Sequence, residues 1–305
     1  MANAQGENIE AVDYNVIRNK INQVMGTGIG QSGYGQTVYS TDVGVNQDIT
    51  AQQWNLLRFD IFNARIHQDG TTPTIVQANQ GSVITFGSAH PNSQYNTQSD
   101  LATANRFNIG VGQFEIDTGT SQTRATAWTT SVSCTCTVSF GSADQARWFF
   151  NSGGKIRFTS NRVGGTASPQ NASWSGLLNS AGTVEFGGII PSAINFYSLT
   201  NSPQIFFATG SSGAYSGNIY RLSAQSNVAN NINGGATVIQ FTALWQDQYA
   251  YGGSGTSGFP DNVDGTLSWT VDELRAAGVL QNGTPTPGSF SITRPGYSIT
   301  AITGS

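Results

Sequence analysis

Charged residues are scarce in this chain of 305 residues: they account for 10% of it, against ~25% in a typical soluble domain. The 13 lysines and arginines are fewer than the 17 aspartates and glutamates, so the net charge is -4. A protein that binds nucleic acid through its phosphates needs clustered basic residues, so this composition excludes that class. Apolar residues reach 37%, which can fill a core and excludes a charge-rich disordered chain.

Long apolar runs are absent too. A membrane-spanning helix needs ~20 predominantly apolar residues, and the most apolar stretch, residues 187–199, is interrupted by Pro191 and Asn195. The residues that follow Met1 contain neither the basic nor the apolar region of a secretory signal peptide. We therefore expect a protein that is synthesised in the cytoplasm and has no membrane partner.

Cysteine and histidine each occur only twice. Cys134 and Cys136 are two residues apart on an expected strand, where their Cα atoms would be ~6.8 Å apart, at the far limit of disulfide geometry. We therefore expect two buried free thiols. His67 and His90 lack the paired spacing of zinc ligands, so we interpret both as loop or surface imidazoles. The sequence predicts no metal, no cofactor and no catalytic residue.

Two amphipathic helices are predicted near the N-terminus. Apolar residues recur at helical spacing over residues 7–25 and again over residues 51–66, where Thr50 and Gln53 can form a capping box. The apolar positions are Ile9, Val12, Val16, Ile17, Ile21 and Val24 in the first helix, and Trp54, Leu56, Leu57, Phe59, Ile61, Phe62 and Ile66 in the second. A helix that is apolar on most sides must be covered on most sides.

Between these helices lies a Gly-rich connector, residues 26–35. Its segment Gly28-Ile-Gly30-Gln-Ser-Gly33 has the G-x-G-x-x-G spacing of dinucleotide-binding loops. That motif requires a strand before it and a helix after it, whereas in this chain a helix precedes it and a polar loop follows. We interpret the segment as a flexible connector. Together with the two helices that it joins, it forms the predicted N-terminal helical docking segment, residues 1–70.

After Gly70 the apolar period changes from 3.6 to 2, which indicates strands. Residues 131–140 give the clearest strand, with an apolar face that includes both cysteines and an opposite face of hydroxyl side chains only. Other strands are expected within 74–86 and at 155–160, 183–186, 194–199, 204–208, 218–224, 236–246, 266–270, 289–292 and 298–302, and short helices at 96–104, 142–151, 173–180 and 270–277. The predicted fold class is mainly β: an antiparallel β-sandwich body over residues 71–305 with short helical inserts, after the N-terminal helical segment.

Two groups of carboxylates are candidates for chemistry. Glu115 and Asp117 lie on one face of a strand, and paired carboxylates can hydrolyse glycosides, but such pairs are common on solvated faces and we favour that interpretation. Asp261 and Asp264, which precede Gly265, supply oxygen ligands for calcium but lack the spacing of an EF-hand loop. We favour an Asx-rich turn there.

Three segments carry a resemblance to a known family. Ser142-Ala-Asp-Gln-Ala-Arg-Trp-Phe-Phe-Asn-Ser-Gly-Gly-Lys-Ile-Arg-Phe158 resembles virion structural proteins of tailed phages, especially marine myoviruses of the T4-like type. Gln170-Asn-Ala-Ser-Trp-Ser-Gly-Leu-Leu178, followed by Gly182-Thr-Val-Glu-Phe186, is similar to the next block of that family. Trp54-Asn-Leu-Leu-Arg-Phe-Asp60 and Ala64-Arg-Ile-His-Gln-Asp-Gly70 are similar to its lead-in. The resemblance spans roughly the first two-thirds of the chain and includes no catalytic pattern.

The resemblance implies a structural subunit of a phage virion, in the tail or the baseplate–fibre region, that assembles as a homo-oligomer and docks to other virion proteins. The protein would be located in the virion, with neither nucleic acid nor a membrane as partner. Two alternatives stay open. A receptor- or glycan-binding fibre module would expose aromatic residues on loops such as residues 249–265. A tail-borne polysaccharide-degrading enzyme would need carboxylates that converge in a cleft.

The N-terminal segment carries the predicted contact with other chains. Two helices alone cannot cover the apolar surface described above, and large exposed apolar patches mark interaction sites. The expected contact residues are Trp54, Leu57 and Ile61, at or next to an intersubunit interface, and Gly28, Gly30 and Gly33, which would let the first helix reach a neighbour.

Overall fold

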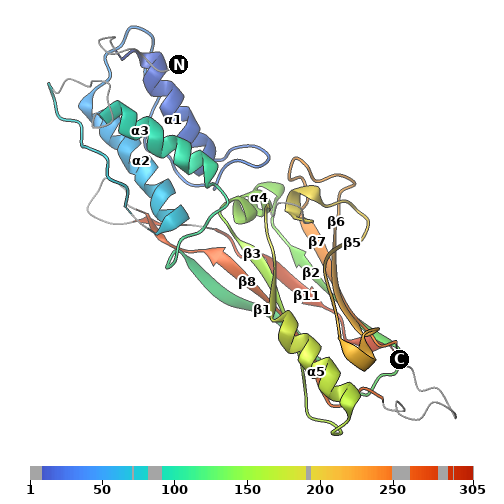
Figure 1. Cartoon of the computed structure of the whole chain (residues 1–305). Helices are drawn as coiled ribbons and strands as arrows, with labels where there is room; N and C mark the ends of the chain where they lie inside the picture. Colours follow the sequence, from blue (N-terminus) through green and yellow to red (C-terminus); the bar gives the residue numbers. More distant parts are fainter. Residues whose placement is uncertain are drawn as a thin grey trace. The chain divides into compact units, whose positions relative to one another are not determined.

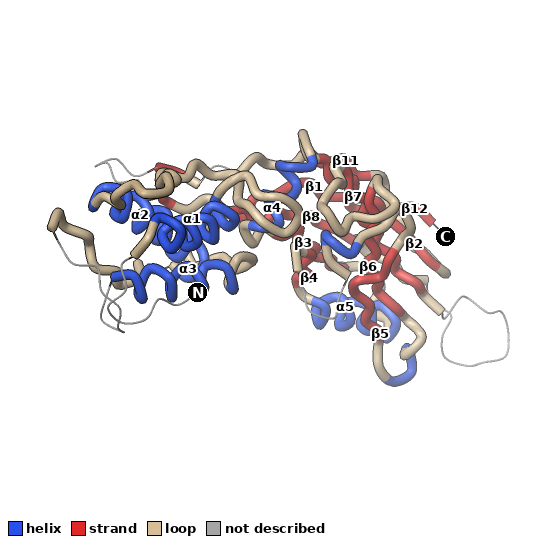
Figure 2. Tube along the Cα trace, turned by 90° about the horizontal axis from the view of Figure 1, so that it is seen from above, coloured by secondary structure: helices blue, strands red, loops and turns tan. Residues whose placement is uncertain are grey.

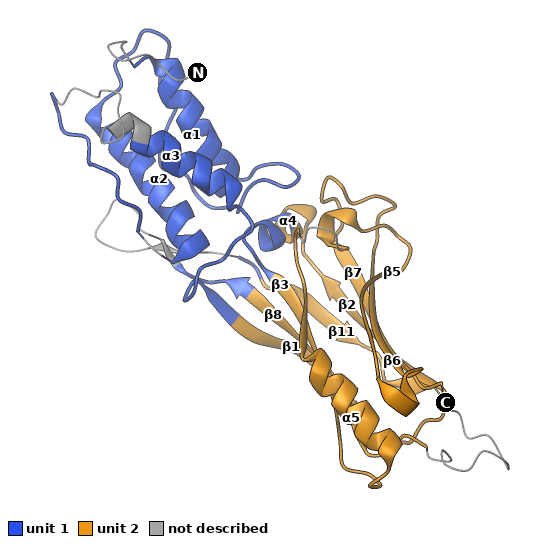
Figure 3. Ribbon diagram, in the orientation of Figure 1, with its two compact units in different colours: residues 1–115, 147–154, 275–293 blue, residues 116–146, 155–274, 294–305 orange. Residues whose placement is uncertain are grey.

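The structure is a computed structural model, and it describes residues 9–70, 72–81, 91–189, 194–248, 262–280, 288–290 and 292–304. The chain forms two compact units (Figure 3): unit 1 contains residues 1–115, 147–154 and 275–293, and unit 2 contains residues 116–146, 155–274 and 294–305. Each unit therefore combines segments that are distant in the sequence. The boundary that we expected at residue 70 falls inside unit 1.

Unit 1 is built around three helices, α1 (Ala11–Met25), α2 (Ala51–Asp69) and α3 (Pro91–Ala104), each of which contacts the other two (Figure 1). One aromatic ring from each helix meets in the centre: the Trp54 ring lies edge-on to those of Tyr14 and Tyr95, with centroids 5.2 and 4.8 Å away. The predicted capping box of α2 is present, because the side chains of Thr50 and Gln53 each accept a hydrogen bond from the other residue's backbone N–H.

α1 buries only part of the apolar stripe that we predicted. Its buried side chains are Tyr14, Ile17, Ile21, Val24 and Met25. By contrast, Val12 is 60% exposed and Val16 is 45% exposed. Tyr14, which was not among the predicted apolar positions, anchors the helix. Its ring packs on Trp54, and its hydroxyl donates a hydrogen bond to the Gln53 carbonyl at 3.2 Å.

Two short strands complete unit 1 after α3. β9 (Val279–Leu280) and β10 (Gly288–Ser289) pair antiparallel, and β9 contacts α2. These strands come from the C-terminal part of the chain, so unit 1 combines the N-terminal helices with a segment distant in the sequence.

Unit 2 is an antiparallel β-sandwich with short helical inserts, which confirms the predicted fold class. Figure 2 shows its two layers of strands. The four-stranded sheet has the order β1 (Phe114–Arg124), β8 (Thr266–Ala276), β3 (Lys155–Val163) and β4 (Thr183–Phe186). The six-stranded sheet has the order β11 (Gly296–Ile299), β2 (Ser131–Ser139), β7 (Val238–Gln246), β6 (Ile219–Ser226) and β5 (Gln204–Gly210), and β12 (Thr303–Gly304) also pairs with β2.

Aromatic side chains fill the space between the two sheets. The Phe158 ring on β3 lies 4.9 Å from the Phe241 ring on β7 and 5.8 Å from the Trp269 ring on β8. Because successive strand residues point to opposite faces, their neighbours along each strand face outwards. Each such buried ring stabilises the sandwich by ~1.5–3 kcal/mol before the entropy of ordering it is subtracted.

Short helical inserts interrupt the strands. α4 (Ala143–Asn151) follows β2, and α5 (Pro169–Ala181) follows β3 and packs on β3 and β5. α5 begins where the Ser168 hydroxyl accepts the Asn171 N–H, with Pro169 in the first turn. A short 3-10 turn, η2 (Gly213–Tyr215), lies between β5 and β6.

The two cysteines are buried free thiols on the inner face of β2, as predicted. Burial raises the pKa of Cys134 to about 11 and that of Cys136 to about 12. Both thiols therefore stay protonated at neutral pH, which makes them poor nucleophiles and poor metal ligands.

The helix predicted at residues 270–277 is wrong, because residues 270–276 belong to β8. The Thr270-Val-Asp-Glu273 pattern fits a capping box locally. However, Trp269, Val271 and Glu273 alternate inwards, and β8 pairs with β3 from Thr266 to Leu274. Pairing and burial along a whole strand outweigh the preference of one turn.

The strand predicted at residues 194–199 is also wrong. The chain forms a 3-10 turn, η1 (Phe196–Ser198), because the Asn195 side chain accepts the N–H groups of Tyr197 and Ser198. Residues 74–81, part of another expected strand region, form no strand, and residues 82–86 lie outside the described residues.

Candidate functional site

The Gly-rich segment between α1 and α2 is a compact loop. Gly28, Gly30 and Gly33 have φ angles of 49°, 55° and 91°, which residues with a side chain rarely adopt. The loop closes on itself, since the Gly35 N–H donates to the Gly26 carbonyl at 2.8 Å. The glycines are therefore required by the backbone conformation of this loop.

The end of α4 holds the loop in place. Asn151 Nδ2 lies 3.0–3.2 Å from three loop carbonyl oxygens, those of Gly30, Ser32 and Gly33. Trp148 Nε1 donates to the Thr27 carbonyl at 2.9 Å. A dinucleotide-binding loop presents N–H groups to phosphate, whereas carbonyl oxygens converge in this loop, so its polarity is wrong for an anion. The segment, which we expected to be a flexible connector, is a loop held by hydrogen bonds from α4. That its glycines let α1 contact a neighbouring chain stays a prediction.

The expected contact residues of α2 lie inside unit 1. Trp54 is 1% exposed, and Leu57 and Ile61 are 0% exposed. We expected two helices to be unable to cover this surface, but α3 and β9 complete the cover. These side chains therefore pack against their own chain, and the intersubunit contact that we assigned to them stays a prediction.

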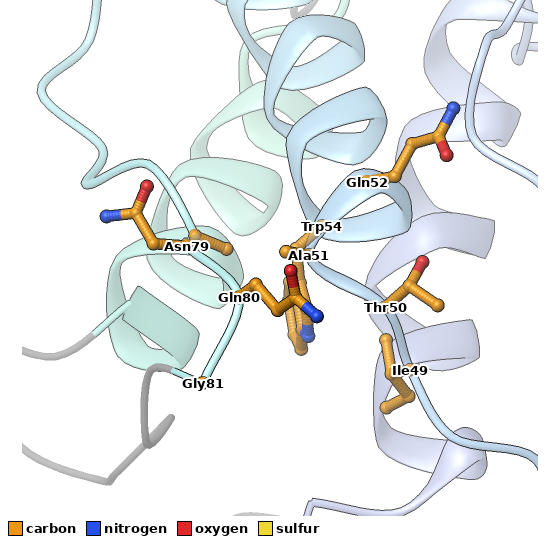
Figure 4. Close-up of a pocket in the computed structure, with 9 residues that line it drawn as sticks. Ile49, Thr50, Ala51, Gln52, Trp54, Asn79, Gln80 and Gly81 are labelled. Carbon is orange, nitrogen blue, oxygen red and sulfur yellow. The ribbon is translucent and has the colours of Figure 1, made fainter.

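A cavity of about 400 Å³ lies beside the first turn of α2 (Figure 4). Its lining comprises Ile49, Thr50, Ala51, Gln52, Trp54, Ala78, Asn79, Gln80 and Gly81. Trp54 is too deeply buried to offer a ring face on which a sugar could stack. None of the lining side chains is an acid or a base, so this cavity offers no group for proton transfer.

The carboxylates of β1 face guanidinium groups. Glu115 Oε2 lies 2.8 Å from Arg275 Nη2, and Asp117 Oδ2 lies 3.9 Å from Arg294 Nε. Each of the two carboxylates is thus engaged with a guanidinium group of its own.

A buried carboxylate joins the two sheets of unit 2. Glu273 on β8 is 0% exposed; its Oε1 accepts a hydrogen bond from Arg294 Nε at 2.7 Å, and its Oε2 accepts one from the Tyr297 hydroxyl at 2.6 Å. Tyr297 lies on β11 of the other sheet. Burial, together with the neighbouring Glu273 carboxylate, raises the pKa of Tyr297, so its hydroxyl keeps the proton that it donates. We refer to Glu273, Arg294 and Tyr297 as the sheet latch.

Asp264 holds the loop that precedes α5. Its carboxylate accepts hydrogen bonds from the Thr166 N–H, the Thr166 hydroxyl and Asn171 Nδ2, and lies 3.4 Å from Arg162 Nη2. The hydrogen bond from Thr166 is the main cause that lowers the pKa of Asp264. Asp261 lies outside the described residues. Among the residues that the structure describes, no group of three or more His, Cys, Asp or Glu side chains could hold a metal ion.

His67 is not the surface imidazole that we expected. It lies on α2, is 1% exposed and has Nε2 2.7 Å from the Ser152 carbonyl oxygen. The ring stacks on Phe290, with centroids 4.2 Å apart. Burial lowers the pKa of His67 to about 4, so the ring is neutral at neutral pH. His90 lies outside the described residues.

The outer face of the six-stranded sheet is the most extensive candidate for an interaction surface. We call it the polar sheet face; its members are Gly296 and Ser298 of β11, Ser131, Ser133, Thr135, Thr137 and Ser139 of β2, Val238, Gln240, Thr242, Leu244 and Gln246 of β7, Ile219, Arg221, Ser223 and Gln225 of β6, and Ile205 and Ala208 of β5. The strand register sets them in rows, one of which is Thr135, Thr242, Ser223 and Ile205. Arg221 is the one charged member.

The outer face of the four-stranded sheet has a different composition. Lys155 and Arg157 of β3 both face Glu185 of β4, at 2.5 and 3.5 Å. Arg157 is also paired in register with Asp272 of β8. This outer face therefore carries several charged side chains, whereas the polar sheet face carries Arg221.

Sequence reasoning found only part of the polar sheet face. The hydroxyl side chains of residues 131–139 form an alternating pattern in the sequence. A similar alternation over residues 219–225 and 238–246 could have identified the outward-facing residues of those strands. Which strands lie next to one another, and in which register, follows only from the folded sheet.

Comparisons with known proteins give no relative: no family model, no curated protein and no solved structure matches this chain. Within the described part of the chain, no helix is both long and apolar enough to cross a membrane.

Proposed function

We propose that this chain is a structural subunit of a phage virion, in the tail or the baseplate–fibre region, that assembles as a homo-oligomer and docks to other virion proteins. The observation that supports a structural role best is the polar sheet face. A wide strand surface with one charged side chain suits burial against a neighbour, because charged residues are depleted from the centres of protein interfaces. The sequence segments between residues 54 and 186 that resemble virion proteins suggest the kind of particle.

The carboxylates of the described residues support a role without catalysis. Glu273 is sealed in the sheet latch, Asp264 ties a loop, and Glu115 faces Arg275. These three carboxylates are engaged in holding the fold, and we propose no enzymatic activity for the chain.

The cavity beside α2 favours a second candidate function, the recognition of a host glycan. Its lining includes the amide side chains of Gln52, Asn79 and Gln80, and amides can bond sugar hydroxyl groups. Binding to a glycan array that is lost in Gln52→Ala and Asn79→Ala variants would favour this candidate. A Thr159→Ala variant, changed on the outer face of β3, is the matched control.

Electron microscopy of labelled particles tests the structural proposal. Antibodies against the purified chain are applied to purified virions from cells that produce it. We expect label at a fixed place on the tail or baseplate of each particle. Label that is absent from intact and partly disassembled particles, although the chain is abundant in the lysate, would refute a virion role.

A further inference from the structure

The polar sheet face is large enough for a stable interface. β2 and β7 each contain nine residues, so the face extends about 30 Å along the strands at ~3.3 Å per residue. From β11 to β5, strands spaced ~4.8 Å apart span about 20 Å. A flat contact of that size would bury about 1,200 Å² in total, which reaches the range of specific interfaces.

The chemistry of the face selects the kind of partner. One cation, Arg221, cannot neutralise the phosphates of a nucleic acid. The face contains no aromatic side chain on which a sugar ring could stack. A nearly neutral surface does not repel a copy of itself, so it meets the requirement of self-complementarity for a twofold contact.

Two pairs of polar side chains on the face already contact each other within hydrogen-bond distance. The hydroxyl oxygens of Thr135 and Thr242 lie 3.3 Å apart, and Gln225 Nε2 donates to Gln240 Oε1 at 2.7 Å. These partners are kept when a second surface covers the sheet, so fewer buried polar atoms are left without a hydrogen bond. Ile205, which is 53% exposed, adds apolar area at one side of the face.

The edges of the same sheet are less suitable for association. β5 has an irregular register between Ile205 and Phe207, and such bulges discourage the addition of a further strand. At the other side, β2 pairs with both β11 and β12. The face therefore offers the better surface for another chain.

We propose that a second copy of this chain packs on the polar sheet face, sheet against sheet, around a twofold axis. This inference rests on the proposed function, because it names the surface through which the structural subunit associates with itself. The two sheets would lie ~10 Å apart, with hydroxyl, amide and aliphatic side chains between them. The charged outer face of the four-stranded sheet would remain outside this contact.

Cysteine cross-linking in the full chain tests the proposal. Thr135→Cys, Thr242→Cys and Ser223→Cys each place a nearly isosteric thiol in the central row of the face. The matched control is Thr159→Cys, because Thr159 lies on the outer face of the four-stranded sheet. Like Thr135, it has its hydroxyl oxygen 3.3 Å from that of a threonine on the next strand, Thr183. The reagent is a bismaleimide whose reach matches the ~10 Å spacing of packed sheets. The native thiols are buried and do not compete.

We expect a covalent dimer from at least one face variant and none from Thr159→Cys. No dimer from any of the three face variants, or an equal yield from the control, overturns the proposal. The variants are small changes, and continued protection of the native thiols shows that each has folded.

Sedimentation of charged variants gives a second test. Thr242→Lys combined with Ser223→Lys puts like charges opposite each other across the axis and should weaken association by at least about tenfold. Thr159→Lys should leave it unchanged. Wild-type association in the double variant, or a wild-type chain that stays monomeric at every concentration, overturns the twofold contact. Particle labelling decides the virion role separately, so the two proposals can fail independently.

Discussion

Removing one hydroxyl group from the sheet latch should destabilise unit 2. In a Tyr297→Phe variant, Glu273 Oε2 loses the donor that lies 2.6 Å away, while Arg294 still occupies Oε1. The carboxylate is 0% exposed, so water cannot replace the lost partner. A hydrogen bond to a charged group contributes ~1.5–3 kcal/mol, and we expect a loss of stability in that range.

Urea unfolding followed by tryptophan fluorescence measures this effect, because Trp245 and Trp269 are buried in the core of unit 2. The midpoint should fall while the dependence on urea concentration stays the same, since the surface exposed on unfolding does not change. In thermal unfolding, the expected loss corresponds to ~3–12 °C for a unit of this size.

A second Tyr→Phe substitution in the same core separates the latch from a general effect of removing a hydroxyl group. The Tyr220 hydroxyl is buried beside the Trp269 side chain, without a hydrogen bond of normal geometry. Its ring stacks on Trp245, a contact that phenylalanine preserves. Tyr220→Phe should therefore be neutral or slightly stabilising. Equal midpoint shifts in the two variants, or a Tyr297→Phe loss below ~0.5 kcal/mol, would refute the energetic role of the latch.

Three further outcomes are expected. Burial lowers the pKa of His67 from 6.5 to about 4. Between these two pH values, the imidazole is protonated in the unfolded chain and neutral in the folded chain. Stability should therefore fall by up to ~3 kcal/mol as the pH falls through this window. His67→Gln should flatten that slope in urea midpoints taken at a series of pH values, and an unchanged slope would contradict this account. Cys134 and Cys136 should react with a thiol reagent only at the rate of unfolding, because both are buried with raised pKa values; rapid native labelling would show that they face outwards. Gly35→Ala should destabilise unit 1 strongly, because the new Cβ would lie 2.3 Å from Trp148 Cδ2. If the variant unfolds thermally at the wild-type temperature, this account of the tethered loop is wrong.

Local patterns predicted those elements whose signals lie within a few residues. Thr50 and Gln53 fixed the start of α2, and the alternation of residues 131–139 indicated a strand with its cysteines inwards. The same kind of local pattern failed at residues 270–276, where Thr270 and Glu273 imitate a helix start inside a paired strand. In α1 the pattern identified the buried Ile17, Ile21 and Val24 but missed Tyr14, which packs on Trp54 of α2.

The candidate surface was predictable only in its composition. By itself the sequence determined that the body would be mainly β, poor in charge and equipped with a hydroxyl face on residues 131–139, because these properties depend on residue types and on period. The tertiary structure alone decided that β7 and β6 continue that face and that the charges of β3 and β4 lie on the other one. It also decided that the end of α4 tethers the Gly-rich loop, through Asn151. These outcomes depend on contacts between residues far apart in the chain, and a local pattern carries no information about which distant partner a side chain will meet.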